Sequence, residues 1–339
     1  MQRDQLSTLR ADVLERARSA FAHMDEISEQ NTKKVLDVMR ACRVSDVHFN
    51  VSAGYAYSDL GREKLDEVYA RVFGAERALV RTQFVSGTHA LAAVLFGLLR
   101  PGDRLVSITG TPYDTMQTVI GWAHESCGSL KEFGVSYDEL PMRDGRVDLA
   151  GIARIVTSET KVALVQRSRG YSERQPLSIA DIRAVSARIK AANPNCIVFV
   201  DNCYGEFVET EEPTAIADVD IMAGSLIKNP GGGLAPTGGY IAGRSSLVEM
   251  ASYRLTAPGM GDELGASLIS NRLLFQGLFL APHVVAQALK GAVFAAGIFE
   301  GLGCRTVPHF DEVRGDIIQA IELGDAERMK AFARAIQAM

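Results

Sequence analysis

Residues 178–202, SIADIRAVSARIKAANPNCIVFVDN, decide the fold class because they predict one helix followed by one buried strand. Ser178 suits the N-cap position of a helix, and Asp181 stands three residues later, as in a capping box. Apolar residues then recur at helical spacing up to Asn193, which precedes a proline and therefore disfavours helix. The apolar run 196–200 has the length and composition of a buried strand.

The same alternation of helix and strand extends over the centre of the chain. A helix is predicted from Ser86 to about Leu99, and the turn Pro101-Gly102-Asp103 ends it. Short apolar strands are predicted at 104–108 and 161–165. Strands alternating with amphipathic helices indicate an α/β fold with a mostly parallel sheet covered on both faces. In such sheets ligands bind beyond the carboxyl ends of the strands.

Three regions are expected along the chain. Residues 1–52 form an N-terminal helical arm, residues 53–250 form the ligand-binding large domain, and residues 251–339 are mainly helical. The most apolar stretch, residues 284–299, is interrupted by polar side chains and is short for a membrane span. It is therefore predicted to be a buried helix, and we expect no membrane partner.

Composition and charge exclude several classes of protein. The chain has 339 residues and a net charge of −5, which argues against a nucleic-acid surface because phosphate binding needs concentrated Lys and Arg. The polar N-terminus lacks the apolar core of a signal peptide. The five cysteines are scattered without metal-ligand spacing, so reduced thiols, no metal site and a cytoplasmic location are expected. They are Cys42, Cys127, Cys196, Cys203 and Cys304.

Lys228 is the first candidate for a chemical role. It follows the predicted strand 221–223 and precedes the glycine run 231–233. A lysine in a partly desolvated pocket can lose its proton and attack an aldehyde, and the glycines let the backbone pass close to a ligand. The alternative is a surface lysine before a glycine turn, and the motif by itself favours that alternative.

Asp201 is the second candidate, at the end of the fully apolar strand 196–200. A lone buried carboxylate is costly, so it needs a cationic partner. A protonated pyridine nitrogen is such a partner, and the ring then withdraws electrons from a substrate carbanion. An aspartate that caps the next turn is the alternative.

Two further segments suit a phosphate and an aromatic ring. Ser86, Gly87 and Thr88 stand where the helix N-terminus offers free amide groups and the positive end of its dipole. A plain N-cap explains them equally well. Tyr113, just beyond the strand 104–108, could stack on an aromatic cofactor, whereas packing in the core is the alternative.

Taken together, these residues resemble fold-type I pyridoxal-phosphate enzymes of the cystathionine and methionine lyase kind, in particular the bacterial "aluminium resistance" or methionine gamma-lyase-like family. The resemblance implies an aspartate aminotransferase-like large domain with a mostly parallel seven-stranded sheet, followed by an incomplete small C-terminal domain. The matching segments extend from about residue 50 to 245. They are Gly54–Arg62, Val85–Ala90, Val165–Tyr171, Val200–Glu206 and Gly224–Gly239.

The resemblance implies a role for each matching residue. Lys228 forms a Schiff base with pyridoxal 5′-phosphate and carries protons once the substrate displaces it. Asp201 pairs with the pyridine nitrogen, and Tyr113 stacks on the ring. The phosphate is held by Ser86, Gly87, Thr88 and Ser225. Ile227 replaces the threonine that often precedes the lysine, which removes one hydroxyl from the phosphate site.

The resemblance also implies a homodimer or homotetramer with active sites shared between subunits. In the lyases a Tyr-x-Arg loop reaches the neighbouring subunit's phosphate, and Tyr55, Tyr57 and Arg62 are the nearest equivalents, at a different spacing. Relatives take the substrate carboxylate on an arginine of a complete small domain, and we expect this sequence to end partway through that domain. Arg167 and Arg169 are then the candidates, with structural ion pairs as the alternative.

The resulting hypothesis is a pyridoxal-phosphate-dependent carbon–sulfur lyase for a sulfur-containing amino acid of the cystathionine, cysteine or methionine type. Elimination of a β or γ thiol would leave a 2-oxo acid and ammonia. Since the fold supports many chemistries, transamination, aldol cleavage and cofactor binding with little catalysis stay open as alternatives.

Overall fold

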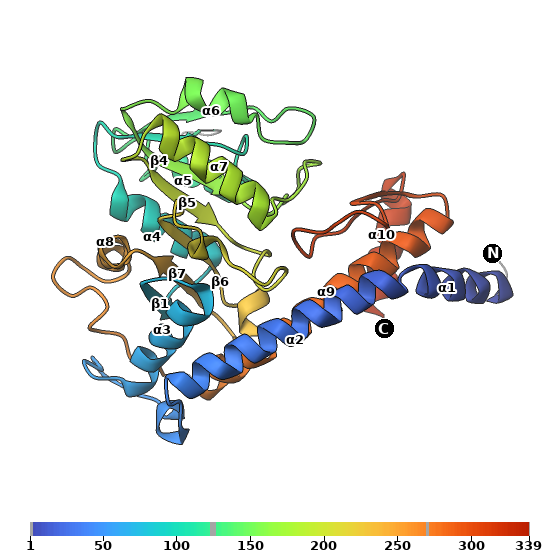
Figure 1. Ribbon diagram of the computed structural model, residues 1–339, viewed down its shortest axis with the longest axis horizontal. Helices are drawn as coiled ribbons and strands as arrows, with labels where there is room; N and C mark the ends of the chain where they lie inside the picture. The colour runs from blue at the N-terminus through green and yellow to red at the C-terminus, as the bar shows by residue number, and fades with distance from the viewer. Residues whose placement is uncertain (1–2, 123–126, 269–270, 339) are drawn as a thin grey trace.

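The protein is described by a computed structural model that covers residues 3–122, 127–268 and 271–338 (Figure 1). Helices and strands alternate in the central part, and two long helices extend away from it. The helices are α1 (Arg3–Arg16), α2 (Arg18–Ala41), α3 (Leu60–Phe73), α4 (Gly87–Leu98), α5 (Asp114–Ile120), α6 (Leu149–Ile155), α7 (Ile179–Ala192), α8 (Ser245–Leu255), α9 (Asn271–Gly301) and α10 (Ala326–Gln337), with short 3-10 turns at Asp46–Phe49, Pro213–Ala215 and Asn229–Gly231.

The central sheet has seven strands in the order β1-β7-β6-β5-β4-β2-β3. Strands β2 to β6 run parallel, and β7 lies antiparallel between β1 and β6. The expected α/β fold with a mostly parallel seven-stranded sheet is therefore confirmed. The strands are β1 (Arg77–Arg81), β2 (Arg104–Ser107), β3 (Ser136–Glu139), β4 (Thr160–Gln166), β5 (Ile197–Asp201), β6 (Ile221–Ser225) and β7 (Gly239–Gly243).

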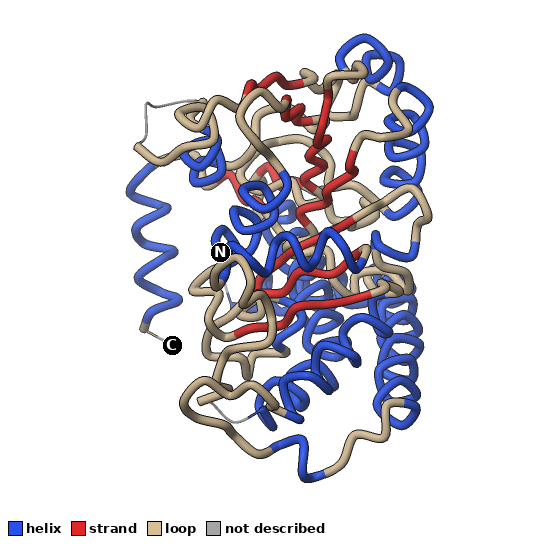
Figure 2. The backbone as a smooth tube through the Cα atoms, turned by 90° about the vertical axis from the view of Figure 1, so that its left-hand side faces the viewer, coloured by secondary structure: helices blue, strands red, loops and turns tan. Residues whose placement is uncertain are grey.

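Helices cover both faces of this sheet (Figure 2). α4, α5 and α8 pack on one face, and α3, α6 and α7 pack on the other together with parts of α2 and α9. Successive strand residues point to opposite faces. In β5, for example, Phe199 belongs to the core under α4, whereas Val198 and Val200 belong to the core under α3 and α7.

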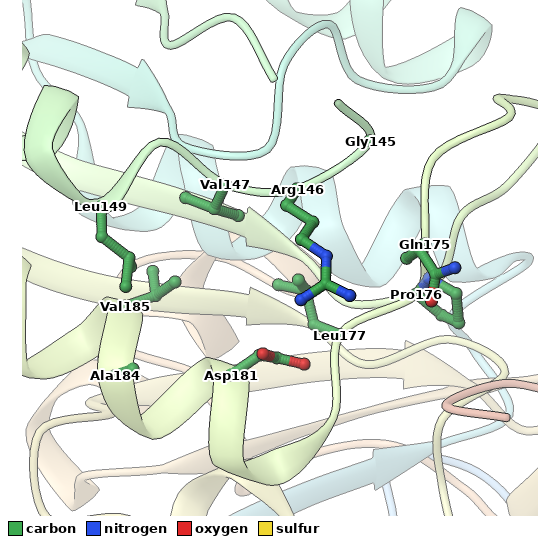
Figure 3. A pocket seen from close by; sticks show the side chains of 10 residues that line it. All are labelled: Gly145, Arg146, Val147, Leu149, Gln175, Pro176, Leu177, Asp181, Ala184 and Val185. Carbon is green, nitrogen blue, oxygen red and sulfur yellow. The ribbon is translucent and has the colours of Figure 1, made fainter. Parts of the chain in front are cut away.

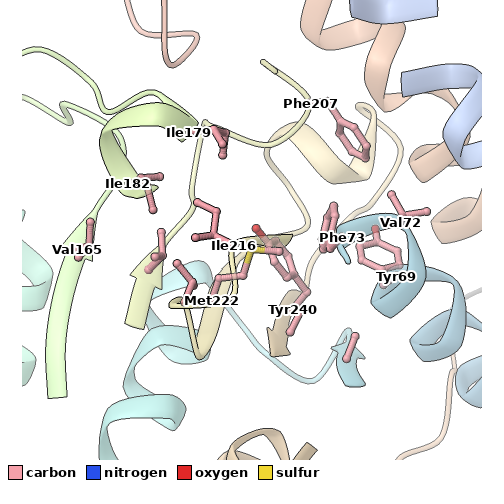
Figure 4. Close-up of a cluster of buried hydrophobic side chains, with 14 of the residues drawn as sticks. Tyr69, Val72, Phe73, Val165, Ile179, Ile182, Phe207, Ile216, Met222 and Tyr240 are labelled. Carbon is pink, nitrogen blue, oxygen red and sulfur yellow. The ribbon is translucent and has the colours of Figure 1, made fainter. Parts of the chain in front are cut away.

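The core under α3 and α7 contains a cluster of aromatic rings (Figure 4). Phe73 lies edge-on to Tyr69 at 5.4 Å between ring centroids and 5.1 Å from the ring of Tyr240. Each such pair contributes about 0.5–1.5 kcal/mol beyond the burial of its area. This packing fixes β7 and the adjoining strand β6, whose end supplies the site.

Local sequence signals explain the helix ends. The Ser86 side chain accepts a hydrogen bond from the His89 amide at the start of α4, and Ser178 and Asp181 form the predicted capping box of α7. α7 ends at Ala192 with Asn193 as its C-cap, as the following proline predicts.

The apolar segment 284–299 lies within α9, which is long and apolar enough to cross a membrane by length and composition. α9 packs along α2 (Figure 1), and Val285, Leu289 and Val293 are buried among the residues of the protein core. The prediction of a buried helix is thus confirmed.

The region after residue 251 is not mainly helical throughout. Arg305–Val307 (β8) and Ala320–Glu322 (β9) form a small antiparallel sheet before α10. These strands have three residues each, and three of the six residues are exposed, so no apolar run marks them in the sequence.

Candidate active site

The candidate residues converge at the carboxyl edge of the sheet, where they line one cavity of about 340 Å³. β4, β5 and β6 end here, and the N-terminus of α4 faces them. The predicted residues Ser86, Gly87, Thr88, Tyr113, Asp201, Ser225 and Lys228 all line the cavity, as do Asp114, Thr115, Gln166, Ser168, Gly170, Tyr171, Cys203, Tyr204, Ile227 and Ile318.

The N-terminus of α4 forms a cradle against the end of β6. A Cβ added to Gly87 would lie 3.0 Å from the Cβ of Ser225 and 3.5 Å from the Sγ of Cys203, so glycine allows this close approach. The Ser225 Oγ is buried and has no hydrogen-bond partner in the structure. A buried hydroxyl that has no partner and lies beside the free amides of a helix N-terminus suits an anion bound between the hydroxyl and the helix.

Asp201 ends β5 on the same side as Phe199, and the amide of Cys203 donates a hydrogen bond of 3.1 Å to its carboxylate. Burial raises the pKa of Asp201, whereas Lys228 and the Cys203 amide act in the opposite direction. A carboxylate in this setting gains most from a cationic partner inside the cavity.

Lys228 is half-buried, and its Nζ lies 3.9 Å from the centroid of the Tyr204 ring. Burial acts to lower the pKa of Lys228, but the acidic groups of Cys203, Tyr204 and Asp201 outweigh it, and the pKa is raised. Partial desolvation was expected to let this amine lose its proton, but in the cofactor-free protein the neighbouring groups outweigh the effect of burial. The amine is held as an ammonium ion by its neighbours.

Tyr113 immediately precedes α5, and its hydroxyl lies 2.9 Å from the Oγ1 of Thr88. The backbone amide of Tyr113 donates to the side chain of Gln166 at 3.2 Å. Burial raises the pKa of the Tyr113 hydroxyl, so it stays protonated at neutral pH. The ring is thereby fixed at the wall of the cavity from two sides.

Several cavity residues were not predicted from the sequence. Cys203 and Tyr204 lie two and three residues after Asp201, and this proximity in the sequence could have indicated them. Gln166 could have been found from its register, since it pairs with Asp201 across β4 and β5. Ile318 comes from the segment before β9, which the Asp316 carboxylate holds to Ser168 by a 3.0 Å hydrogen bond. No local pattern in the sequence predicts that last contact.

Arg167 and Arg169 do not line the cavity, contrary to the expectation that they meet the substrate carboxylate. Arg167 is fully buried on the opposite side of the sheet, where it contacts Glu209 at 2.8 Å and Glu212 at 3.5 Å. Arg169 is also buried and donates to the backbone carbonyls of Ser172 and Val307. Structural ion pairs, the alternative, fit Arg167, whereas the Arg169 side chain is held by backbone carbonyls.

The N-terminal loop residues fall into two groups. Arg62 is 3% exposed and donates to the carbonyl oxygens of Ala56 and Gly265, so it holds loops of its own subunit instead of facing outward. Tyr55 and Tyr57 are 74% and 62% exposed and do not line the cavity. The expected role in a neighbouring phosphate site thus does not fit Arg62 but is sterically open to the two tyrosines.

A second cavity of about 230 Å³ lies between α6, α7 and the loops around residues 145 and 175 (Figure 3). Arg146 points toward Asp181 there, and both residues are exposed. None of its ten lining residues is a lysine, histidine or cysteine. This cavity holds no group suited to covalent chemistry.

The residues of the first cavity fit pyridoxal phosphate. The α4 cradle and the unpartnered Ser225 hydroxyl suit its phosphate, the buried Asp201 suits its pyridine nitrogen, and Lys228 is an amine for its aldehyde. No cluster suited to a metal ion occurs among the described residues. Fold and cavity together are those of a pyridoxal-phosphate enzyme of fold type I.

Comparison with known proteins specifies the family. The chain belongs to the methionine gamma-lyase family, whose sequence profile matches residues 6–339. It is 51% identical over 316 residues to the uncharacterized protein YnbB of Bacillus subtilis. The aligned residues cover 93% of this chain and 75% of YnbB. This family implies pyridoxal phosphate as the cofactor and places the chain among carbon–sulfur lyases.

Solved structures agree with this assignment. A candidate cystathionine beta-lyase involved in aluminium resistance from Listeria monocytogenes has a TM-score of 0.95 and 50% identity, covering 98% of this chain and 82% of that chain. A carbon–sulfur lyase involved in aluminium resistance from Clostridium novyi has a TM-score of 0.92 and 45% identity, covering 96% of this chain and 78% of that chain.

Proposed function

We propose that this chain is a carbon–sulfur lyase that holds pyridoxal phosphate on Lys228 and acts on a sulfur-containing amino acid of the cystathionine, cysteine or methionine type. The observation that carries the proposal is the meeting of three features in one cavity: an amine, a buried carboxylate and an anion cradle with the unpartnered Ser225 hydroxyl. When bound, the cofactor supplies an electron sink for a substrate carbanion.

The protein's own groups have distinct tasks in this reaction. Asp201 keeps a positive charge on the cofactor nitrogen, which a buried carboxylate favours. Lys228, displaced by the substrate, takes a proton from the α-carbon and returns one later. Tyr113 stacks on the cofactor ring, and its position is fixed by Thr88 and Gln166.

The entrance of the cavity suits an apolar thioether side chain. Ile227 and Ile318 contribute aliphatic surface, and the Tyr171 side chain is 95% exposed beside them. Elimination would release the thiol and leave an enamine, which water would hydrolyse to an oxo acid and ammonia. Loss of a β or a γ thiol gives pyruvate or 2-oxobutyrate, respectively.

A second copy of the chain is part of this proposal. Among the described residues, Lys228 is the one cationic side chain that lines the cavity, whereas both the cofactor phosphate and the substrate carboxylate are anionic. Exposed apolar side chains surround the entrance, notably Val85, Tyr171 and Ile227. We propose a homodimer or homotetramer in the cytoplasm, in which Tyr55 and Tyr57 approach the neighbouring cavity.

The test is a product assay with purified protein supplied with pyridoxal phosphate. L-cystathionine, L-cysteine and L-methionine are incubated separately, and pyruvate, 2-oxobutyrate and ammonia are quantified. The proposal predicts equal amounts of oxo acid and ammonia from at least one of them. A protein that binds the cofactor and releases neither product from any of the three would contradict the lyase activity, and an exchange of amino groups without ammonia would indicate transamination.

A further inference from the structure

The contact between Lys228 and Tyr204 joins two loops that follow neighbouring strands. Tyr204 comes after β5 and Lys228 after β6, and both side chains line the cavity. With the Lys228 Nζ 3.9 Å from the ring centroid, the ammonium lies within the range in which an aromatic face attracts a cation.

The backbone of Tyr204 adopts an unusual conformation to make this contact. Its φ is +70°, in the left-handed region that a bulky side chain rarely adopts, and Phe207 three residues later has a φ of +61°. A residue in this region is energetically unfavourable and persists only where the surroundings determine it. Such outliers mark places where a side chain is held in position for a task.

A buried polar network on the far side of the sheet determines this turn. Arg167 donates to the Asn202 side chain at 2.9 Å, and Asn202 donates to Glu212 at 2.9 Å. Glu212 in turn accepts a hydrogen bond from the amide of Phe207. A Cβ added to Gly205 would lie 2.4 Å from Arg167, so the turn is closed over that side chain.

The loop that carries Lys228 is tied to the same turn. Asn229, the next residue, donates from its side chain to the carbonyl of Glu206 at 2.9 Å. The lysine and the tyrosine therefore keep a fixed relation to each other, and the strained turn cannot relax without moving Lys228.

We propose that Tyr204 is a positioning residue for Lys228: its ring face holds the lysine amine whenever that amine is not bonded to the cofactor. This inference rests on the proposed function of Lys228 and extends it to the free state of the lysine. In the reaction the amine is free after the substrate displaces it, and the ring keeps it beside the cofactor ready to accept a proton. Arg167, predicted as a substrate ligand, acts instead through the turn that positions Tyr204.

The test measures the free Lys228 in the cofactor-free full chain. Reductive methylation with formaldehyde and cyanoborohydride is followed from pH 7 to 11, and mass spectrometry of the Lys228 peptide gives its reactivity at each pH. Tyr204→Phe keeps the ring. Tyr204→Gly removes it and adopts the left-handed backbone without strain, so this variant is expected to fold.

Both variants lose the acidic hydroxyl of Tyr204, which contributes to the raised pKa of Lys228, so both are expected to react at lower pH than the wild type. The reactivity curve of Tyr204→Gly is expected to lie roughly 0.5 to 1.5 pH units below that of Tyr204→Phe, since only the ring, which favours the charged amine, differs between them. The other groups that face Lys228, namely Asp201, Cys203, Glu206 and Tyr113, are unchanged in both variants. Coinciding reactivity curves for Tyr204→Phe and Tyr204→Gly would overturn the role of the ring.

The outcome is separable from that of the proposed function. Uptake of pyridoxal phosphate on Lys228 is measured in the same preparations of wild-type protein. If the wild type forms no bond between Lys228 and the cofactor, the proposed function fails. If it forms that bond but Tyr204→Gly and Tyr204→Phe give the same reactivity curve, only the positioning role fails.

Discussion

At the ends of β4 and β5, the polar side chains on the two faces of the sheet differ in their hydrogen-bond partners. Gln166 and Asp201 face the cavity, whereas the next residues, Arg167 and Asn202, face the buried network on the other side. In the network the Arg167 guanidinium contacts two carboxylates and the Asn202 side chain. On the cavity side the Ser225 hydroxyl has no partner.

This difference separates binding groups from supporting groups. Buried polar atoms are nearly always paired, so an unpaired one at a cavity indicates a ligand, whereas side chains that pair with one another away from the cavity indicate structural support. Substitutions on the cavity side should therefore change cofactor chemistry and leave folding intact. Substitutions in the network should change folding first.

The largest expected effect concerns Lys228. Lys228→Ala should reduce turnover by at least about a thousandfold, roughly 4 kcal/mol, because both the bond to the cofactor and the proton carrier are lost. Oxo-acid release and the visible absorbance of the loaded protein measure this. Lys131→Ala, an exposed lysine away from the cavity, is the control. Full activity in Lys228→Ala would remove this residue from the mechanism.

The network is tested by Arg167→Ala. The change leaves Glu212 buried without its cation, and breaking a buried ion pair in this way costs about 3–5 kcal/mol of unfolding free energy. Urea unfolding of the cofactor-free protein measures the loss. Arg188→Ala on the exposed side of α7 should change it by less than about 0.5 kcal/mol. A similar small loss in Arg167→Ala would show that the network does not support the fold.

A pH effect is expected from Glu206 in the same network. Burial raises the pKa of this carboxyl from 4.5 to about 8, although the Tyr240 hydroxyl donates to it. Since the folded protein binds the proton more tightly, this stabilisation is complete below about pH 4.5 and is lost as the pH rises through 8.

Glu206→Gln has no titratable proton at this position, so it isolates the effect. Relative to this variant, the unfolding free energy of the wild type should fall between pH 5 and pH 9, by an amount on the order of a few kcal/mol. Urea unfolding of both proteins at pH 5, 7 and 9 provides the comparison. If the unfolding free energy of the wild type, relative to Glu206→Gln, stayed constant or rose with pH, Glu206 would be ionised when buried.

The smallest effect is expected for Ser225→Ala. Loss of one hydroxyl from the phosphate cradle should weaken cofactor binding about five- to tenfold, or ~1–1.5 kcal/mol. Folding without cofactor should not change, because this hydroxyl has no protein partner. Equilibrium titration with pyridoxal phosphate and urea unfolding test the two statements, with the exposed Ser158→Ala as control. Unchanged affinity for the cofactor together with a lower unfolding free energy would show that Ser225 supports the fold and does not bind the phosphate.

Features encoded within a few residues were predictable from the sequence. The capped starts of α4 and α7 and the apolar strands β4 and β5 depend on neighbours in the chain. The strands β1, β3 and β7 were missed. β7 has glycine at both ends, and β3 at the sheet edge is largely polar, so neither has an apolar run.

Site residues that follow a strand were predictable from the sequence. Those that depend on the face to which a side chain points, or on a contact between distant parts of the chain, were not. Arg167 lies one position beyond Gln166, and the two-residue period of a strand turns it to the opposite face. Tyr204 reaches Lys228 through a left-handed backbone that its residue type disfavours. Ile318 enters from a segment about 150 residues farther along than Gln166, through a contact that only the folded chain reveals.

The most direct test of the central claim is to identify the residue that carries the cofactor. The purified full chain is loaded with pyridoxal phosphate and reduced with borohydride, and the digested peptides are mapped by mass spectrometry. The account predicts a phosphopyridoxyl group on Lys228, in stoichiometric amount. A group found on another lysine, or the absence of any stable modification, would contradict it.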